Sequence, residues 1–175
     1  MVLKTSDSMI GKTARYIGNM EEGEVCLVMI ICNHCPYVLF RMPQISQLVK
    51  DYKDSVRIVA INSNDASPTT EDSHPEDAPE LMPEFIEKWD LQCDYIFDED
   101  QSIAKDYGAV CTPEFYVVDR EGIIVYHGEL DPSHTSNRLM PTGSSLRHAL
   151  DLALVNKTID WEPNPSFGCS VKWKN

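Results

Sequence analysis

The residues of this chain best suited to chemistry are two cysteines separated by two residues, in the string Ile-Cys-Asn-His-Cys-Pro-Tyr at 31–37. An apolar run, 25–32, ends at Cys32, and a helical pattern follows. A thiol at a helix start faces unpaired backbone N–H groups, whose partial positive charge favours thiolate. Since thiolate attacks disulfides, the pattern predicts Cys32 as the nucleophile and Cys35, one turn into the helix, as the resolving thiol.

The two residues between the cysteines have different predicted roles. A histidine beside a thiol can place positive charge near the sulfur and lower its pKa, so His34 is predicted to tune the pair. Stabilising the thiolate stabilises the reduced form and makes the pair more oxidising. A solvent-facing histidine without an electronic role is the alternative. Asn33 is predicted to serve conformation, since Asn is well accommodated in turns and at helix starts.

Composition limits the classes of protein to consider. With 175 residues, 42% of them apolar, the chain suits one domain, 1–175. No stretch approaches the roughly 18 apolar residues of a membrane span, and the start lacks the apolar segment of a signal peptide, so we expect a cytoplasmic protein without a membrane partner. A net charge of −13 argues against nucleic acid as a partner. Six cysteines in a reducing compartment favour catalysis or metal binding over a disulfide framework.

The elements that would position the cysteines predict an α/β sheet. Residues 24–32 and 56–61 are short apolar runs rich in Val and Ile, typical of strands buried on both faces, and apolar residues recur at helical spacing over 38–52. This β-α-β unit puts the dithiol at the carboxyl end of its first strand, where open α/β sheets place their sites. An α-β-α segment, a hairpin turn at 119–122 and a last helix near 144–155 follow.

Two segments stand outside this pattern. Residues 63–82 form an acidic, Pro-rich insertion, which predicts a solvated surface, with a partner-selecting patch as the alternative. The C-terminal tail, 156–175, has no helical or strand period but carries three large aromatic side chains. Such a composition is costly to leave in water, so the tail is predicted to be ordered and packed on the domain.

Three strings carry a resemblance to a known group of proteins. They are CNHCPYV, CTPEFYVVD and PSFGCSVKW, within 25–173. Through them the chain resembles the thioredoxin-like superfamily and, within it, a redoxin (peroxiredoxin-related) thiol-disulfide oxidoreductase subfamily with a CNHC active site. The resemblance implies a central mixed β-sheet flanked by helices, with an inserted α-β-α segment. It also implies an extra strand or hairpin before the active-site strand, for which only about 23 residues are present.

The resemblance also assigns residues outside the dithiol. It implies a cis peptide bond at Thr112-Pro113 facing the cysteines, with the backbone of Thr112 pairing with a bound substrate strand. It implies a buried acid six residues before the first active-site cysteine, where this chain has Cys26. Glu114 is the nearest replacement as proton acceptor, a solvent-facing glutamate being the alternative. Cys169 is an auxiliary candidate, either as a third exchanging thiol or as a structural thiol.

These features predict a thiol-disulfide oxidoreductase that exchanges disulfides with a protein or small-thiol substrate. We expect an external electron donor, no bound cofactor and no metal. A thiol peroxidase is one alternative, although its T-x-x-C spacing is missing, since Met29 lies three residues before Cys32. A copper or zinc carrier using Cys32, Cys35 and a histidine is another, although C-x-x-C supplies only two ligands. A non-catalytic binding module is the last.

Overall fold

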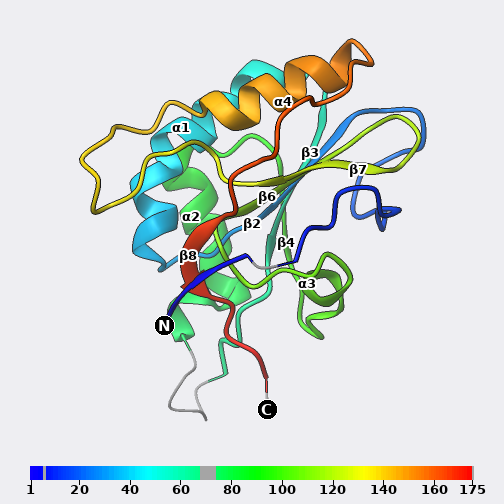
Figure 1. The fold of residues 1–175 in the computed structure, drawn as a ribbon. Helices are drawn as coiled ribbons and strands as arrows, with labels where there is room; N and C mark the ends of the chain where they lie inside the picture. The colour runs from blue at the N-terminus through cyan, green and yellow to red at the C-terminus, as the bar shows by residue number, and fades with distance from the viewer. Residues whose placement is uncertain (6, 68–73, 175) are drawn as a thin grey trace.

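The computed structural model describes residues 1–5, 7–67 and 74–174, and it confirms the predicted α/β fold class (Figure 1). Its centre is a five-stranded sheet in the order β4-β3-β2-β6-β7. The strands are β2 (Cys26–Ile30), β3 (Arg57–Asn62), β4 (Asp94–Phe97), β6 (Glu114–Val118) and β7 (Ile124–Gly128). The first three run parallel, while β6 is antiparallel to both of its neighbours. The sheet is therefore mixed, as predicted.

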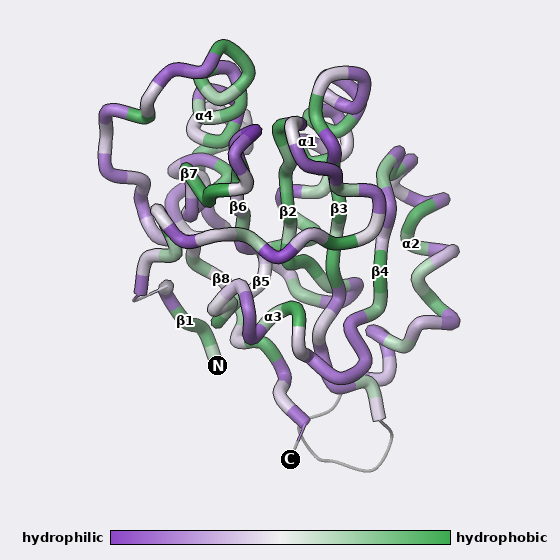
Figure 2. The backbone as a smooth tube through the Cα atoms, turned by 90° about the vertical axis from the view of Figure 1, so that its right-hand side faces the viewer, coloured by the Kyte–Doolittle hydropathy of each residue, from purple (hydrophilic) through white to green (hydrophobic). Residues whose placement is uncertain are grey.

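Helices cover both faces of this sheet. The core cluster on one face includes side chains of α1 (Pro36–Tyr52), α2 (Met82–Trp89) and α4 (Ser144–Leu154), and the cluster on the other includes α3 (Ser102–Asp106). Every residue of β2 is buried, and successive residues alternate between the two clusters, which explains the continuous apolar run. Figure 2 shows α1 and α4 together above the largely apolar central strands. Within the described ranges no helix is long and apolar enough to cross a membrane.

The acidic insertion predicted at 63–82 connects β3 to α2. Of this segment, residues 68–73 lie outside the described residues. The described part contains two short 3-10 helices, η1 (Pro75–Asp77) and η2 (Pro79–Leu81), each with a proline at its first position. These turns bring part of the insertion back to the edge of the sheet where the dithiol lies.

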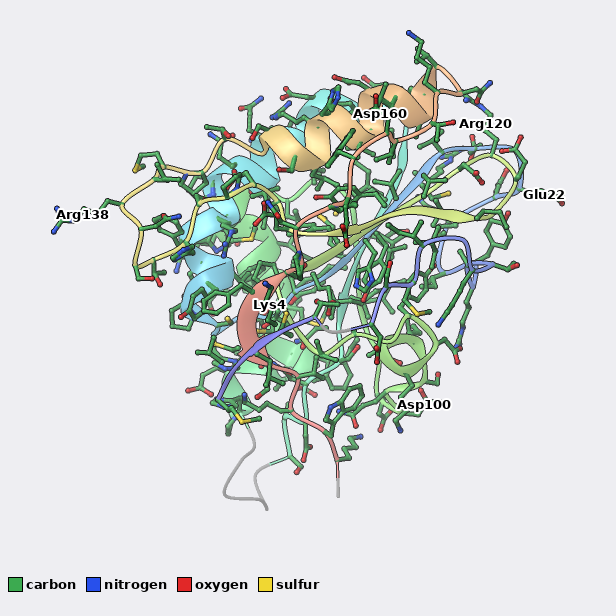
Figure 3. The ribbon with its side chains drawn as sticks, viewed as in Figure 1. Lys4, Glu22, Asp100, Arg120, Arg138 and Asp160 are labelled. Carbon is green, nitrogen blue, oxygen red and sulfur yellow. The ribbon has the colours of Figure 1, made fainter. Side chains whose placement is uncertain are left out.

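A second, three-stranded sheet was not predicted. It has the order β1-β8-β5, from β1 (Val2–Lys4), β8 (Phe167–Ser170) and β5 (Cys111–Thr112), and all its pairs are antiparallel. Figure 3 shows Lys4 on β1 beside the ribbon of β8. The tail thus forms a central strand between the N-terminal segment and the segment before Pro113.

Candidate dithiol site

Cys32 and Cys35 follow β2 at the carboxyl edge of the five-stranded sheet, where the sequence placed them. The N–H of Ile31 donates to the carbonyl of Ile61 at 2.9 Å, so the pairing of β2 with β3 continues to the residue before Cys32. Both side chains are 0% exposed and belong to the core cluster beneath α1. The two thiols are therefore sealed from solvent on their own side of the sheet.

The helix that follows starts later than the sequence analysis predicted. It begins at Pro36, and Cys35 is its N-cap residue, with an extended backbone at φ −62° and ψ 123°. Proline disfavours the α conformation in the residue before it and is well suited to the first helical position. The prediction that Cys32 stands at the helix start with Cys35 one turn inside is therefore wrong, and the N–H groups of Val38 and Leu39 in the first turn donate to the Cys35 carbonyl.

The surroundings of the two sulfurs shift their pKa values in opposite directions. The neighbouring thiols of Cys169 and Cys32 lower the pKa of the Cys35 thiol. Burial raises the pKa of Cys32 well above its usual value, and its hydrogen bond with Cys35 and the charge of Asp77 raise it further. Within the pair, the pKa is therefore lowered at Cys35 and raised at Cys32.

Thr112 lies against both thiols. Its hydroxyl oxygen is 3.4 Å from the Cys32 sulfur, and its carbonyl oxygen accepts from the Cys35 thiol at 3.3 Å when that thiol is protonated. The peptide bond between Thr112 and Pro113 is cis, as expected from the sequence. The segment before this proline therefore faces the dithiol, in the place that the resemblance implied.

Asp77, from the acidic insertion, is the site residue that the sequence analysis missed. Its carboxylate is fully buried, which contradicts the expectation of a solvated surface at this position. One oxygen accepts from the N–H of Asn33 at 2.7 Å. The other lies 2.6 Å from Nδ1 of His34 and accepts from the side-chain amide of Asn64 at 2.8 Å. The insertion therefore holds both residues between the cysteines.

The side chain of Asn33 is held at both ends. Its amide donates to the carbonyl of Glu76 at 3.0 Å, and its own oxygen accepts from the Tyr95 hydroxyl at 2.9 Å. Together with the backbone bond to Asp77, these contacts fix the turn between the cysteines. They give a physical form to the conformational role that the sequence suggested for Asn33.

His34 stands between the buried acid and the thiols. Because the Asp77 carboxylate accepts, Nδ1 of His34 carries a hydrogen, and the ring stacks on His74 with centroids 3.7 Å apart. A ring nitrogen of His34, the Cys32 sulfur and an Asp77 oxygen all lie within 4.8 Å of one another. The carboxylate already accepts three hydrogen bonds, which leaves a thiol and an imidazole, fewer ligands than a closed zinc site needs.

Glu114 is buried rather than solvent-facing, and it points away from the thiols. One carboxylate oxygen accepts from the Thr5 hydroxyl at 2.5 Å and from Nε2 of His127 at 2.8 Å. The other accepts from two backbone N–H groups of residues 110–111, at 2.9 and 3.3 Å. Its neighbour Phe115 packs in the cluster that contains the dithiol, so Glu114 faces the opposite side of the sheet. Glu114 therefore fixes the position of the backbone segment that precedes Thr112.

Comparison with known proteins identifies the family. Residues 7–127 match the AhpC/TSA family. The chain belongs to the AhpC/TSA family. This confirms the predicted thioredoxin-like redoxin superfamily, and the general function of the protein is thiol redox chemistry. No curated protein matched the chain.

Three solved structures show how widely the fold of this AhpC/TSA-family protein is shared. An uncharacterized conserved protein from Geobacillus kaustophilus is 36% identical, with 99% of this chain and 97% of that one covered and a TM-score of 0.91. A hypothetical protein from Sinorhizobium meliloti 1021 is 33% identical, with 98% of each chain covered and a TM-score of 0.89. A secreted disulfide oxidoreductase from Mycobacterium tuberculosis, 16% identical over 74% of this chain and 82% of that one, shares the fold with a TM-score of 0.55.

The remaining cysteines of the AhpC/TSA-family chain divide into spectators and one neighbour of the site. Cys26 occupies the position where the resemblance implied an acid, but it faces the second core cluster, and burial raises its pKa to about 11. Cys169 lies on β8 directly opposite Thr112, and it packs against the core cluster that contains Cys32 and Cys35. The structure thus gathers three thiols, those of Cys32, Cys35 and Cys169.

Proposed function

We propose that the chain is a thiol-disulfide oxidoreductase whose Cys32 and Cys35 cycle between a dithiol and a disulfide. The observation that carries this proposal is the pair of buried thiols that both contact Thr112, directly before Pro113, at the carboxyl edge of the sheet. Two adjacent thiols, one of them with a lowered pKa, are what disulfide exchange requires.

The chemistry follows from which sulfur carries the charge. The Cys35 thiolate attacks a substrate disulfide and forms a mixed disulfide, releasing one thiolate. Cys32 then gives its proton to the released thiolate and attacks the Cys35 sulfur, which frees the second substrate sulfur as a thiolate and closes the Cys32–Cys35 disulfide. This order differs from the one predicted from the sequence, in which Cys32 attacks first, and the lowered pKa of Cys35 supports it.

Substrate, donor and location belong to the same proposal. We infer a disulfide-containing protein or small disulfide as oxidant, and an external electron donor that restores the dithiol without a bound cofactor. A cytoplasmic location is supported by a core that forms while all six cysteines are unpaired.

The two other predicted activities have weaker support. A peroxidase would need a hydroxyl three residues before its reactive cysteine, and that position relative to Cys32 is Met29, which is fully buried. A copper or zinc carrier would rely on Cys32 and His34, because Asp77 already accepts three hydrogen bonds. Both activities are measured in the experiment below.

Insulin reduction by the parent, Cys32→Ser and Cys35→Ser tests the proposed function. We expect turnover to be abolished in both variants, and Cys32→Ser to accumulate a disulfide at Cys35, because attack and resolution need different thiols. Cys93→Ser is the matched control, since Cys93 is half-buried and burial raises its pKa to about 12. Undiminished turnover in both active-site variants contradicts the proposal, as does peroxide consumption or stoichiometric zinc binding without insulin reduction.

A further inference from the structure

The tail places Cys169 by direct backbone contact with the site. Strand β8 pairs with β5 so that Cys169 lies opposite Thr112. A Cβ atom added at Gly168 would stand 1.9 Å from the carbonyl oxygen of Thr112, so only glycine allows the tail backbone to lie this close. The same carbonyl oxygen contacts the Cys35 thiol. The Thr112 carbonyl therefore contacts both the Cys35 thiol and the tail backbone next to Cys169, which brings the tail against the site.

The three thiols differ in their access to solvent. Cys32 and Cys35 are 0% exposed, whereas Cys169 is partly exposed. Cys169 also lines an open cavity of about 560 Å³ with His34, His74 and Lys172, and neither thiol of the buried pair lines it. A cavity of this size is comparable to small-molecule sites in general. A disulfide entering it meets the sulfur of Cys169 before it meets the pair.

We propose that Cys169 is the thiol through which disulfide bonds pass between a substrate in this cavity and the buried Cys32–Cys35 pair. The proposal rests on the proposed function and adds a third thiol to it. The packing supplies the contact that the transfer needs, because Cys169 packs against the core cluster that contains Cys32 and Cys35, and Thr112, which lies opposite Cys169, contacts both of these thiols. The sequence suggested Cys169 either as a third exchanging thiol or as a structural thiol, and this proposal gives it the first of these roles.

The transfer balances without any further reactant. Cys169 loses its proton to water and, as thiolate, attacks the substrate disulfide, which releases one substrate thiolate. Cys35 then gives its proton to that leaving thiolate and attacks the Cys169 sulfur, which frees the second substrate thiolate and leaves a Cys35–Cys169 disulfide. Cys32 finally attacks Cys35, its proton going to the second substrate thiolate. The products are a Cys32–Cys35 disulfide, two substrate thiols and a Cys169 thiolate, which takes back a proton from water.

The rate at which a small disulfide oxidises the reduced protein tests this relay. The probe is bis(2-hydroxyethyl) disulfide, with the Cys32–Cys35 bond quantified by peptide mapping after acid quenching. We expect Cys169→Ser to form this bond at least about tenfold more slowly than the parent. Serine keeps a hydroxyl that can donate to Cys35, so the loss reports the missing sulfur. Cys93→Ser, which changes the other half-buried cysteine, should react at the parent rate.

A trapping experiment gives a second, independent readout. In Cys35→Ser the relay stops after its first step, so the mixed disulfide with the probe should be found on Cys169. Formation of Cys32–Cys35 at the parent rate in Cys169→Ser, or a probe adduct on Cys32 in Cys35→Ser, overturns the relay alone. A parent protein that never forms the Cys32–Cys35 bond overturns the proposed function instead, so the two failures are distinguishable.

Discussion

Two buried pairs of a carboxylate and an imidazole lie on opposite sides of the central sheet. Within the described residues, both ring nitrogens of one histidine have hydrogen-bond partners, whereas only one ring nitrogen of the other has. Glu114 and His127 meet at 2.8 Å, Asp77 and His34 at 2.6 Å, and both carboxylates are completely buried. The His127 side chain is 1% exposed and uses both ring nitrogens, because Nδ1 accepts from the N–H of Met9 at 3.1 Å. It is therefore a neutral ring whose Nε2–H donates to Glu114.

His34 is the open counterpart. Its side chain is 16% exposed, it lines the cavity beside Cys169, and only Nδ1 has a hydrogen-bond partner in the described part of the chain. A ring with both nitrogens bonded can only hold its surroundings together. A ring that is oriented through one nitrogen, lines a cavity and lies within 4.8 Å of a thiol can take part in proton transfer or tune that thiol. The same pair of residue types thus serves architecture on one side of the sheet and the dithiol on the other.

The largest effect on stability should come from breaking the Glu114–His127 pair. Glu114→Leu leaves four donors without their acceptor, from Thr5, His127 and two backbone N–H groups. We expect the free energy of unfolding to fall by about 3–5 kcal/mol. Urea denaturation measures this, with Glu24→Leu as the control, because Glu24 pairs with Arg57 on the surface and its loss should change little. Equal losses of unfolding free energy in the two variants would show that the buried Glu114–His127 pair stabilises the fold no more than a surface ion pair does.

The sequence predicted the parts of this molecule that are specified locally. Strands β2 and β3 and helix α1 follow from continuous apolar runs and a helical stripe, which need no distant partner to be recognised. The start of α1 was also encoded locally, by Pro36, and giving that proline its weight would have placed Cys35 at the N-cap.

Asp77 and β8 could not be predicted in the same way. Asp77 looks like its acidic neighbours, and it is buried only because donors from Asn33, His34 and Asn64, distant in sequence, converge on it. Strand β8 is four residues long and is formed by pairing on both edges rather than by its own pattern. Both contribute to the candidate site. The sequence therefore pointed to the cysteine pair itself but not to the residues that pack around it.

Asp77→Asn, which weakens the Asp77–His34 pair, should have an intermediate effect on stability and on the rate of disulfide exchange. An amide offers one acceptor where the carboxylate offers two, so either the Asn33 N–H or the donors on the other oxygen lose their partner. We expect unfolding free energy to fall by about 1–3 kcal/mol and disulfide exchange to slow by roughly tenfold, because the turn between the cysteines loosens.

Asp98→Asn is the matched control for Asp77→Asn. Asp98 is also buried, and it accepts from the N–H groups of Ile103 and Ala104 at the start of α3, away from the thiols. We expect it to lose similar stability while exchange proceeds at the parent rate. If Asp98→Asn slows exchange as much as Asp77→Asn does, the effect of Asp77 is general destabilisation rather than positioning of the site.

The smallest effect is a shift in the reduction potential of the Cys32–Cys35 pair when His34 is replaced by Leu. The charge of Asp77 contributes to the raised pKa of Cys32, and His34 lies between that charge and the sulfur. Replacing His34 by Leu leaves the negative charge uncompensated, which disfavours thiolate and hence the reduced form. We expect the potential of the Cys32–Cys35 pair to fall by on the order of 30 mV, about 1.4 kcal/mol.

Equilibration against glutathione redox buffers measures this shift, in a Cys169→Ser background so that one pair alone is counted. His148→Leu should leave the potential unchanged, since His148 is on α4 and stacks on Trp161. Adding Asp77→Asn to His34→Leu removes the charge as well, so the double variant should return toward the parent value, and the cycle of four proteins isolates the coupling between acid and imidazole. A His34→Leu variant as oxidising as the parent would mean that the open nitrogen does not tune the dithiol, and the contrast with His127 would then be one of exposure alone.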